Sequence, residues 1–113
     1  MMLKDSVRLG GLLPQTVLAY VIAESVFQRV AGSGCRMTSC NDSQHGGHPV
    51  AGENKDPHYT GRAIDLGIKE IPVAVRGTLV NALGAALGTE YDVLWEARGT
   101  DNEHLHIQYT GVA

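Results

Sequence analysis

The sequence is poor in cysteine, in aromatic residues and in long apolar runs. Its 113 residues include two cysteines, and 5% of the residues are aromatic. Cys35 and Cys40 are too few for the disulfide framework that small secreted domains use. Charged and amide side chains interrupt the apolar stretch from Leu12 to Val30, so we expect no membrane-spanning segment. The N-terminus also lacks the apolar core of a signal peptide.

The sequence has no excess of positive charge. Nine Lys and Arg residues stand against twelve Asp and Glu residues, which gives a formal net charge of -3. Because the basic residues are scattered, no cationic stripe can neutralise phosphates, and we expect no nucleic-acid partner. The 43% hydrophobic and 19% charged content is that of an ordinary globular chain. We therefore predict one domain over 1–113, with a core large enough to fold without a metal.

Apolar periodicity and turn residues predict an α+β fold. Two helices are predicted over 14–31 and 72–87, where apolar residues recur at helical spacing and a glycine follows the last turn. Strands are predicted over 35–39, 63–68, 91–96 and 104–109, the last two forming a hairpin. Residues 41–57 are rich in Gly, Asn, His and Pro and predict a long loop of the kind that is commonly functional. The expected architecture is a small antiparallel sheet with two helices.

Three of the five histidines lie beside carboxylates in two short motifs. The first motif, HYTGRAID, runs from His58 to Asp65, and the second, EHLH, runs from Glu103 to His106. Apolar residues alternate with these positions in the predicted strands, so Asp65, His104 and His106 are expected to face away from the core. Two imidazoles and one carboxylate can therefore converge on a metal ion.

This pattern, His-x6-Asp followed later by His-x-His, resembles the zinc peptidases of the D-alanyl-D-alanine carboxypeptidase and LAS group. These enzymes share the Hedgehog/DD-peptidase fold. The similarity is closest to small phage-type members, through HYTGRAIDL at 58–66 and YDVLWE…EHLHIQY within 91–109. The resemblance implies that His58, Asp65 and His106 bind Zn²⁺ and leave the fourth coordination position to water, as catalytic zinc sites do.

Glu103 is the expected general base, and His104 is the alternative. Glu103 stands three residues before His106, and this matches the Glu-x-x-His arrangement of the group. A regular strand would turn a residue at that odd spacing to the opposite face, so Glu103 needs a loop conformation to act as the base. If the strand is regular back to Asn102, His104 takes this role instead.

Arg36 is the candidate for holding the substrate. It ends the segment Ser-Gly-Cys-Arg, which resembles the Ser-Gly-Tyr-Arg of the group. A second alignment, through Thr38 and Ser39, leaves no arginine at that position and brings His45 to the site. The chain also has Asp56 two residues before the first histidine, where the group has serine, and this extra acid could bind the metal or repel an anionic substrate.

The resemblance implies a zinc-dependent peptidase that cleaves peptidoglycan stem peptides, at a terminal D-Ala-D-Ala or an internal L-Ala-D-Glu-type bond. Without a signal peptide, such an enzyme would be made in the cytoplasm and would reach the cell wall after lysis or delivery, as an endolysin or a virion-associated protein. The alternative is a non-catalytic zinc-binding virion or wall-binding module of the same fold. Cys35, Cys40, His45 and His48 suggest a second metal cluster, but their spacing is shorter than a zinc finger needs, and reduced thiols are predicted.

Overall fold

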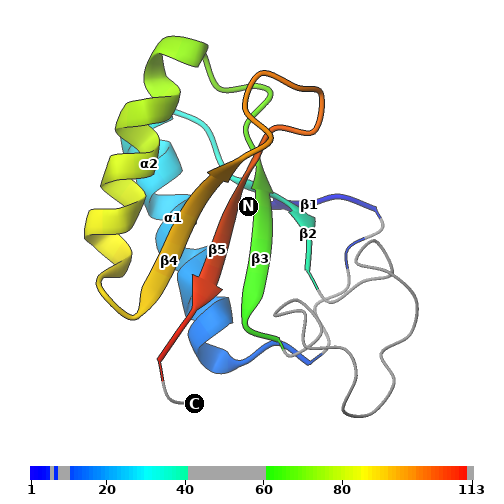
Figure 1. The fold of residues 1–113 in the computed structure, drawn as a ribbon, viewed down its shortest axis with the longest axis vertical. Coiled ribbons are helices and arrows are strands. Elements are labelled where there is room, and N and C mark those ends of the chain that lie inside the picture. Colours follow the sequence, from blue (N-terminus) through cyan, green and yellow to red (C-terminus); the bar gives the residue numbers. More distant parts are fainter. Residues whose placement is uncertain (6, 8–10, 41–60, 112–113) are drawn as a thin grey trace.

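The computed structural model describes residues 1–5, 7, 11–40 and 61–111. Within these residues the chain forms β1 (Met2–Leu3), α1 (Pro14–Ala31), β2 (Arg36–Ser39), β3 (Ala63–Gly67), α2 (Val73–Leu87), β4 (Tyr91–Glu96) and β5 (His104–Tyr109) (Figure 1). Both predicted helices and all four predicted strands are confirmed to within one residue at each end. The loop predicted over 41–57 lies outside the described residues.

The five strands form one sheet in the order β1-β2-β3-β5-β4. The pairs β2–β3, β3–β5 and β4–β5 are antiparallel, whereas β1 runs parallel to β2. The α+β class is therefore confirmed, but the prediction of an antiparallel sheet is wrong at this edge, and the sheet is mixed. Strand β1 was not predicted because two residues are too few to show an alternating pattern. It pairs with β2 through backbone hydrogen bonds from Met2 N–H to the Cys35 carbonyl and from Lys4 N–H to the Met37 carbonyl, both 2.9 Å long.

The two helices cover one face of the sheet. In Figure 1 α1 lies behind the strands, and α2 runs beside β4. Leu66 and Leu105, from the two central strands, belong to the same buried cluster as Phe27 of α1 and Leu79 of α2. Burial of each such side chain contributes about 1.5–3 kcal/mol of stability. Because successive strand residues face opposite ways, the residues next to these leucines lie on the other face, away from the helices. We call this other face the open face of the sheet.

Helix α1 begins and ends where the sequence predicts. Pro14 is the first residue of the helix. Proline has no backbone N–H, and a residue at this position has no partner for one within the helix. Gly32 follows the helix in the left-handed conformation (φ 72°), and its N–H donates to the carbonyl of Gln28 at 3.1 Å. Among the described residues, no helix combines the length and the apolar character needed to cross a membrane.

Gly61 ties the start of α1 to the chain just before β3. Its carbonyl accepts hydrogen bonds from the Thr16 hydroxyl at 2.6 Å and from Leu13 N–H at 3.1 Å. Its φ is +75°, and a Cβ at this position would collide with the backbone carbonyl of Gly11. Only glycine allows this close approach. The contact places the first residue of β3 relative to the helices.

We expect Gly61→Ala to lower the free energy of unfolding by about 2–4 kcal/mol, because a side chain there adds left-handed strain to a backbone collision. The matched control is Gly77→Ala in α2, where a Cβ meets nothing within 4 Å. This control should raise stability by about 0.5–1 kcal/mol. Urea unfolding of the two variants measures both effects. A Gly61→Ala variant as stable as the unaltered protein would contradict the constraint.

Candidate metal centre

Asp65 and His106, one from each of the two motifs, meet on the open face of the sheet. They are partners across β3 and β5 and are both buried, at 7% and 9% exposure. The His106 Nδ1–H donates to Asp65 Oδ1 at 3.0 Å. Side chains at directly opposed positions of paired strands lie on the same face, so the register accounts for this contact. The expectation that these two residues converge is met.

The surroundings of His106 favour a positive charge on its ring. Burial by itself lowers the pKa of His106, but its hydrogen bonds to Asp65 and Gln108 and the negative charges of Asp65 and Glu96 outweigh burial and raise the pKa above its usual value. The Gln108 bond, to Nε2, is 3.1 Å long. A metal cation binds a deprotonated imidazole nitrogen, so a metal ion and a proton compete for the His106 ring.

Glu96, which sequence reasoning missed, joins Asp65 and His106 in this group. It ends β4 opposite His104, and its Oε1 lies 3.9 Å from His106 Nδ1. One ligand atom from each of Asp65, Glu96 and His106 lies within 4.8 Å of the other two. Alternation along β4 would place Glu96 on one face with Asp92. The missing information was the register of β4 against β5, which brings that face to His106.

These three side chains could hold a divalent metal ion. Zn²⁺ is bound in proteins by histidine nitrogen and carboxylate oxygen, and this donor set fits it. Carboxylate and imidazole ligands also suit other divalent metals, so the set does not select zinc by itself. His58, the first zinc ligand implied by the resemblance, lies outside the described residues, as do His45, His48 and Asp56.

His104 stands beside this group on the same face of the sheet. Its Nε2 lies 3.0 Å from Glu96 Oε1 and 3.8 Å from Asp65 Oδ2. Its Nδ1 lies 2.7 Å from the carbonyl oxygen of Asn102, which can only accept, so Nδ1 carries a proton. A neutral ring then keeps its lone pair at Nε2, and a protonated ring donates from Nε2 to Glu96. His104 and Glu96 can therefore share one proton.

Arg36 lies in the same row of the sheet as His104 and Glu96. It pairs with Gly67 of β3, and Gly67 pairs with His104 of β5. Two strand spacings separate the backbones of Arg36 and His104, which is about 10 Å. Gly67, which lies between them, has no side chain, and the Thr38 methyl group covers it, because a Cβ at Gly67 would lie 2.9 Å from Thr38 Cγ2. Cys35, next to Arg36, and Cys40 are both buried.

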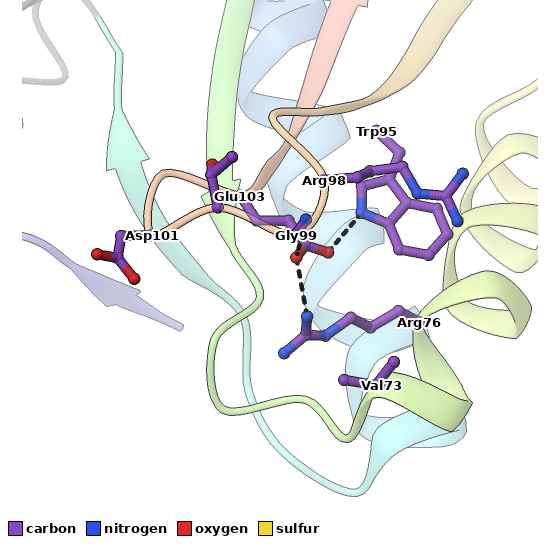
Figure 2. Close-up of a pocket in the computed structure, with 8 residues that line it drawn as sticks. Val73, Arg76, Trp95, Arg98, Gly99, Asp101 and Glu103 are labelled. Carbon is purple, nitrogen blue, oxygen red and sulfur yellow. Dashed lines mark hydrogen bonds and ion pairs between the residues drawn. The ribbon is translucent and has the colours of Figure 1, made fainter.

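Glu103 has the loop conformation that its predicted role needs, because β5 begins one residue later. Its carboxylate, however, accepts three hydrogen bonds (Figure 2): Oε2 from Trp95 Nε1 at 2.7 Å, and Oε1 from Gly99 N–H and Arg76 Nη1, both at 3.1 Å. Trp95 and Arg76 lie on the helix side of the sheet. Glu103 is 8% exposed and is not part of the group formed by Asp65, Glu96 and His106. Its role as the base stays a prediction.

Comparisons with known proteins find no family model, no curated protein and no solved structure that matches this chain. Its function is inferred from its own residues and from the resemblance of the two motifs. The grouping of Asp65, Glu96 and His106 is the structural observation on which that inference depends most.

We expect Zn²⁺ to raise the Tm of the protein, because a ligand that binds only the native state stabilises it, by about 2.7 kcal/mol at a hundred times its Kd. Glu96→Gln keeps the side-chain shape and removes a negative charge from beside Asp65 and His106, so it should weaken zinc binding about tenfold or more. Competition with a coloured chelator measures the affinity.

Asp92→Asn is the matched control for Glu96→Gln. Asp92 lies on β4, on the same face as Glu96, and pairs with Gln108. The change removes the same charge from the same strand and should leave zinc affinity within about twofold. Absence of a Tm shift with Zn²⁺, Mn²⁺ and Co²⁺ alike would show that these residues hold no metal.

The ionisation of Glu103 should make the free energy of unfolding depend on pH. Hydrogen bonds from Gly99 and Trp95, and then the Arg76 charge, lower the pKa of Glu103 below its ordinary 4.5 although burial opposes the shift. A lowered native pKa contributes stability that is complete above about pH 4.5 and is lost as the pH falls through the native value. We therefore expect Glu103→Gln to be less stable than the unaltered protein at pH 7 and the difference to shrink by pH 3. An unchanged difference, measured by urea unfolding, would contradict the shift.

Proposed function

We propose that this chain is a zinc-dependent peptidase that cleaves peptidoglycan stem peptides on a Hedgehog/DD-peptidase-like fold. The observation that carries the proposal is that Asp65 and His106, taken from the two motifs, are neighbours on one face with Glu96 beside them. Asp65, His106 and His58 are the proposed zinc ligands. A bound zinc ion supplies a Lewis acid and lowers the pKa of a coordinated water to about 7.

His104 is the proposed proton-transfer residue, and Glu103 is the second candidate. The Asn102 carbonyl fixes the proton on Nδ1 of His104, so its Nε2 faces the carboxylates of Glu96 and Asp65. Glu96, whose side chain is 44% exposed, faces solvent and can accept a proton from Nε2. His104 can thereby take a proton from attacking water and return one to the leaving amine.

Arg36 is proposed to bind a carboxylate of the substrate. Stem peptides have carboxylates, and a guanidinium binds them through paired N–H donors. Arg36 lies two strands away from His104 in the same row of the sheet, on the same face as the metal group. The proposed place of action is the bacterial cell wall, reached after lysis or delivery. The proposed scissile bond is either a terminal D-Ala-D-Ala bond or an internal L-Ala-D-Glu-type bond.

One observation favours the second candidate, a non-catalytic zinc-binding virion or wall-binding module. The carboxylate that the resemblance assigns as the base, Glu103, is already bound by three donors on the helix side of the sheet. A module of this kind would bind zinc and peptidoglycan and release no amino groups.

Digestion of purified peptidoglycan tests the proposed activity. We expect the zinc-loaded protein to release amino groups, a chelator to stop the release, and mass spectrometry of the muropeptides to identify the bond. His104→Ala should keep its zinc and lose about 10²- to 10⁴-fold in kcat, whereas Asp65→Asn should lose both zinc and activity. Asp92→Asn should keep both. Zinc bound stoichiometrically with no release from pH 5 to 9 would favour the binding module.

A further inference from the structure

We propose that Glu103 is a positioning residue, whose carboxylate clamps the turn between β4 and β5 and thereby holds Glu96 and His104 opposite each other. The catalytic consequence rests on the proposed function, but the structural claim does not. Glu96 ends β4, His104 begins β5, and the two are the last pair of the hairpin before the turn. Their separation therefore depends on the conformation of residues 97–103.

The backbone of this turn is not favourable by itself. Ala97 has a φ of +54°, the one positive value outside glycine among the described residues, and Gly99 has a φ of +79°. A left-handed alanine costs about 1–2 kcal/mol. Thr100 donates to the Ala97 carbonyl from its N–H at 3.1 Å and its hydroxyl at 2.6 Å. Two more bonds lie within the turn, from Glu103 N–H to the Thr100 carbonyl and from Asn102 N–H to the Thr100 hydroxyl, both at 3.2 Å. Bonds to other elements are needed to fasten the turn to the strand and the helix.

The Glu103 carboxylate supplies these bonds from inside the turn (Figure 2). Its three donors come from three places: Gly99 in the turn, Trp95 in β4 and Arg76 in α2. Arg76 is itself fixed, because its Nε donates to the carbonyl of Ile71 at 2.8 Å. The turn is thus fastened both to the strand and to the helix. Bonds to a charged acceptor are stronger than neutral ones, so a carboxylate suits this position.

Each side of this clamp is adjacent to a residue of the site. Trp95, which donates to Glu103, directly precedes Glu96. Asn102, directly before Glu103, has the carbonyl that accepts the His104 Nδ1–H at 2.7 Å. A turn that changes conformation would therefore move Glu96 and would take the Asn102 carbonyl away from His104. A displacement of about 1 Å can lower catalysis a hundredfold.

The bonding of Glu103 leaves it little capacity to act as a base. A general base must lie within hydrogen-bond reach of the proton that it takes. Both oxygens of Glu103 already accept bonds, and they face Trp95 and Arg76 on the helix side, whereas Asp65 and His106 face the open side. The hypothesis that Glu103 clamps the turn and the hypothesis that it is the general base predict different outcomes for the same substitutions.

Imidazole ¹⁵N NMR of the metal-free protein tests the clamp without any activity. We expect His104 to show a proton on Nδ1 in the unaltered protein and in Glu103→Gln, whose amide oxygen still accepts from Trp95. Glu103→Ala should lose this signature, and Trp95→Phe, which removes the indole donor, should shift it in the same direction. Asp101→Ala is the control, because it removes an exposed carboxylate from the same turn and should change nothing.

Peptidoglycan digestion then separates the clamp from the base. With a clamp, Glu103→Gln keeps kcat within about tenfold, Glu103→Ala loses about a hundredfold, and adding Trp95→Phe to Glu103→Ala lowers kcat no further. With a base, Glu103→Gln loses as much as Glu103→Ala, about 10²- to 10⁴-fold. Unchanged His104 signals in Glu103→Ala, or the second kinetic pattern, would overturn the proposal. An unaltered protein without peptidase activity would overturn only the proposed function, because the NMR comparison still decides on the clamp.

Discussion

The register of β3, β5 and β4 is the constraint on which the rest of this structure depends. It sets Asp65 opposite His106 and Glu96 opposite His104, all on the face away from the helices. A slip of one residue in either pairing would turn a whole strand over and exchange its polar and apolar faces. The buried leucines beneath the helices prevent such a slip, because it would expose them to water. Packing of the apolar residues on the helix side thus determines which polar side chains are neighbours on the open face.

The open face brings together groups that are unfavourable to bury separately. Asp65 and His106 are both nearly inaccessible, and each gains from the opposite charge and the hydrogen bond of the other. The partly exposed Glu96 adds negative charge next to His106. Such a group favours a cation, whether a proton on the imidazole or a metal ion between the ligands. The same grouping supports the proposed zinc centre and accounts for the raised pKa of His106.

The two glutamates near the β4–β5 turn lie on opposite sides of the sheet. Glu96 faces the open side, where His104 Nε2 is its neighbour at 3.0 Å, and Glu103 faces the helix side among three donors. A carboxylate that faces solvent can exchange protons, and one that accepts three bonds is held in the charged form. The environment of Glu96 therefore suits proton transfer, and the environment of Glu103 suits a positioning role.

Local patterns were enough to predict both helices, four of the five strands and the face on which Asp65, His104 and His106 lie, because periodicity depends only on neighbours along the chain. They could not identify the parallel strand β1, which is too short to have a pattern, or Glu96, whose role depends on its cross-strand partner. The surroundings of Glu103 were equally hidden, since Arg76 and Trp95 reach it only after α2 and the hairpin pack together. The sequence by itself determined which residues could meet, and the tertiary structure decided which of them do, because strand register and turn conformation are set by contacts between distant parts of the chain.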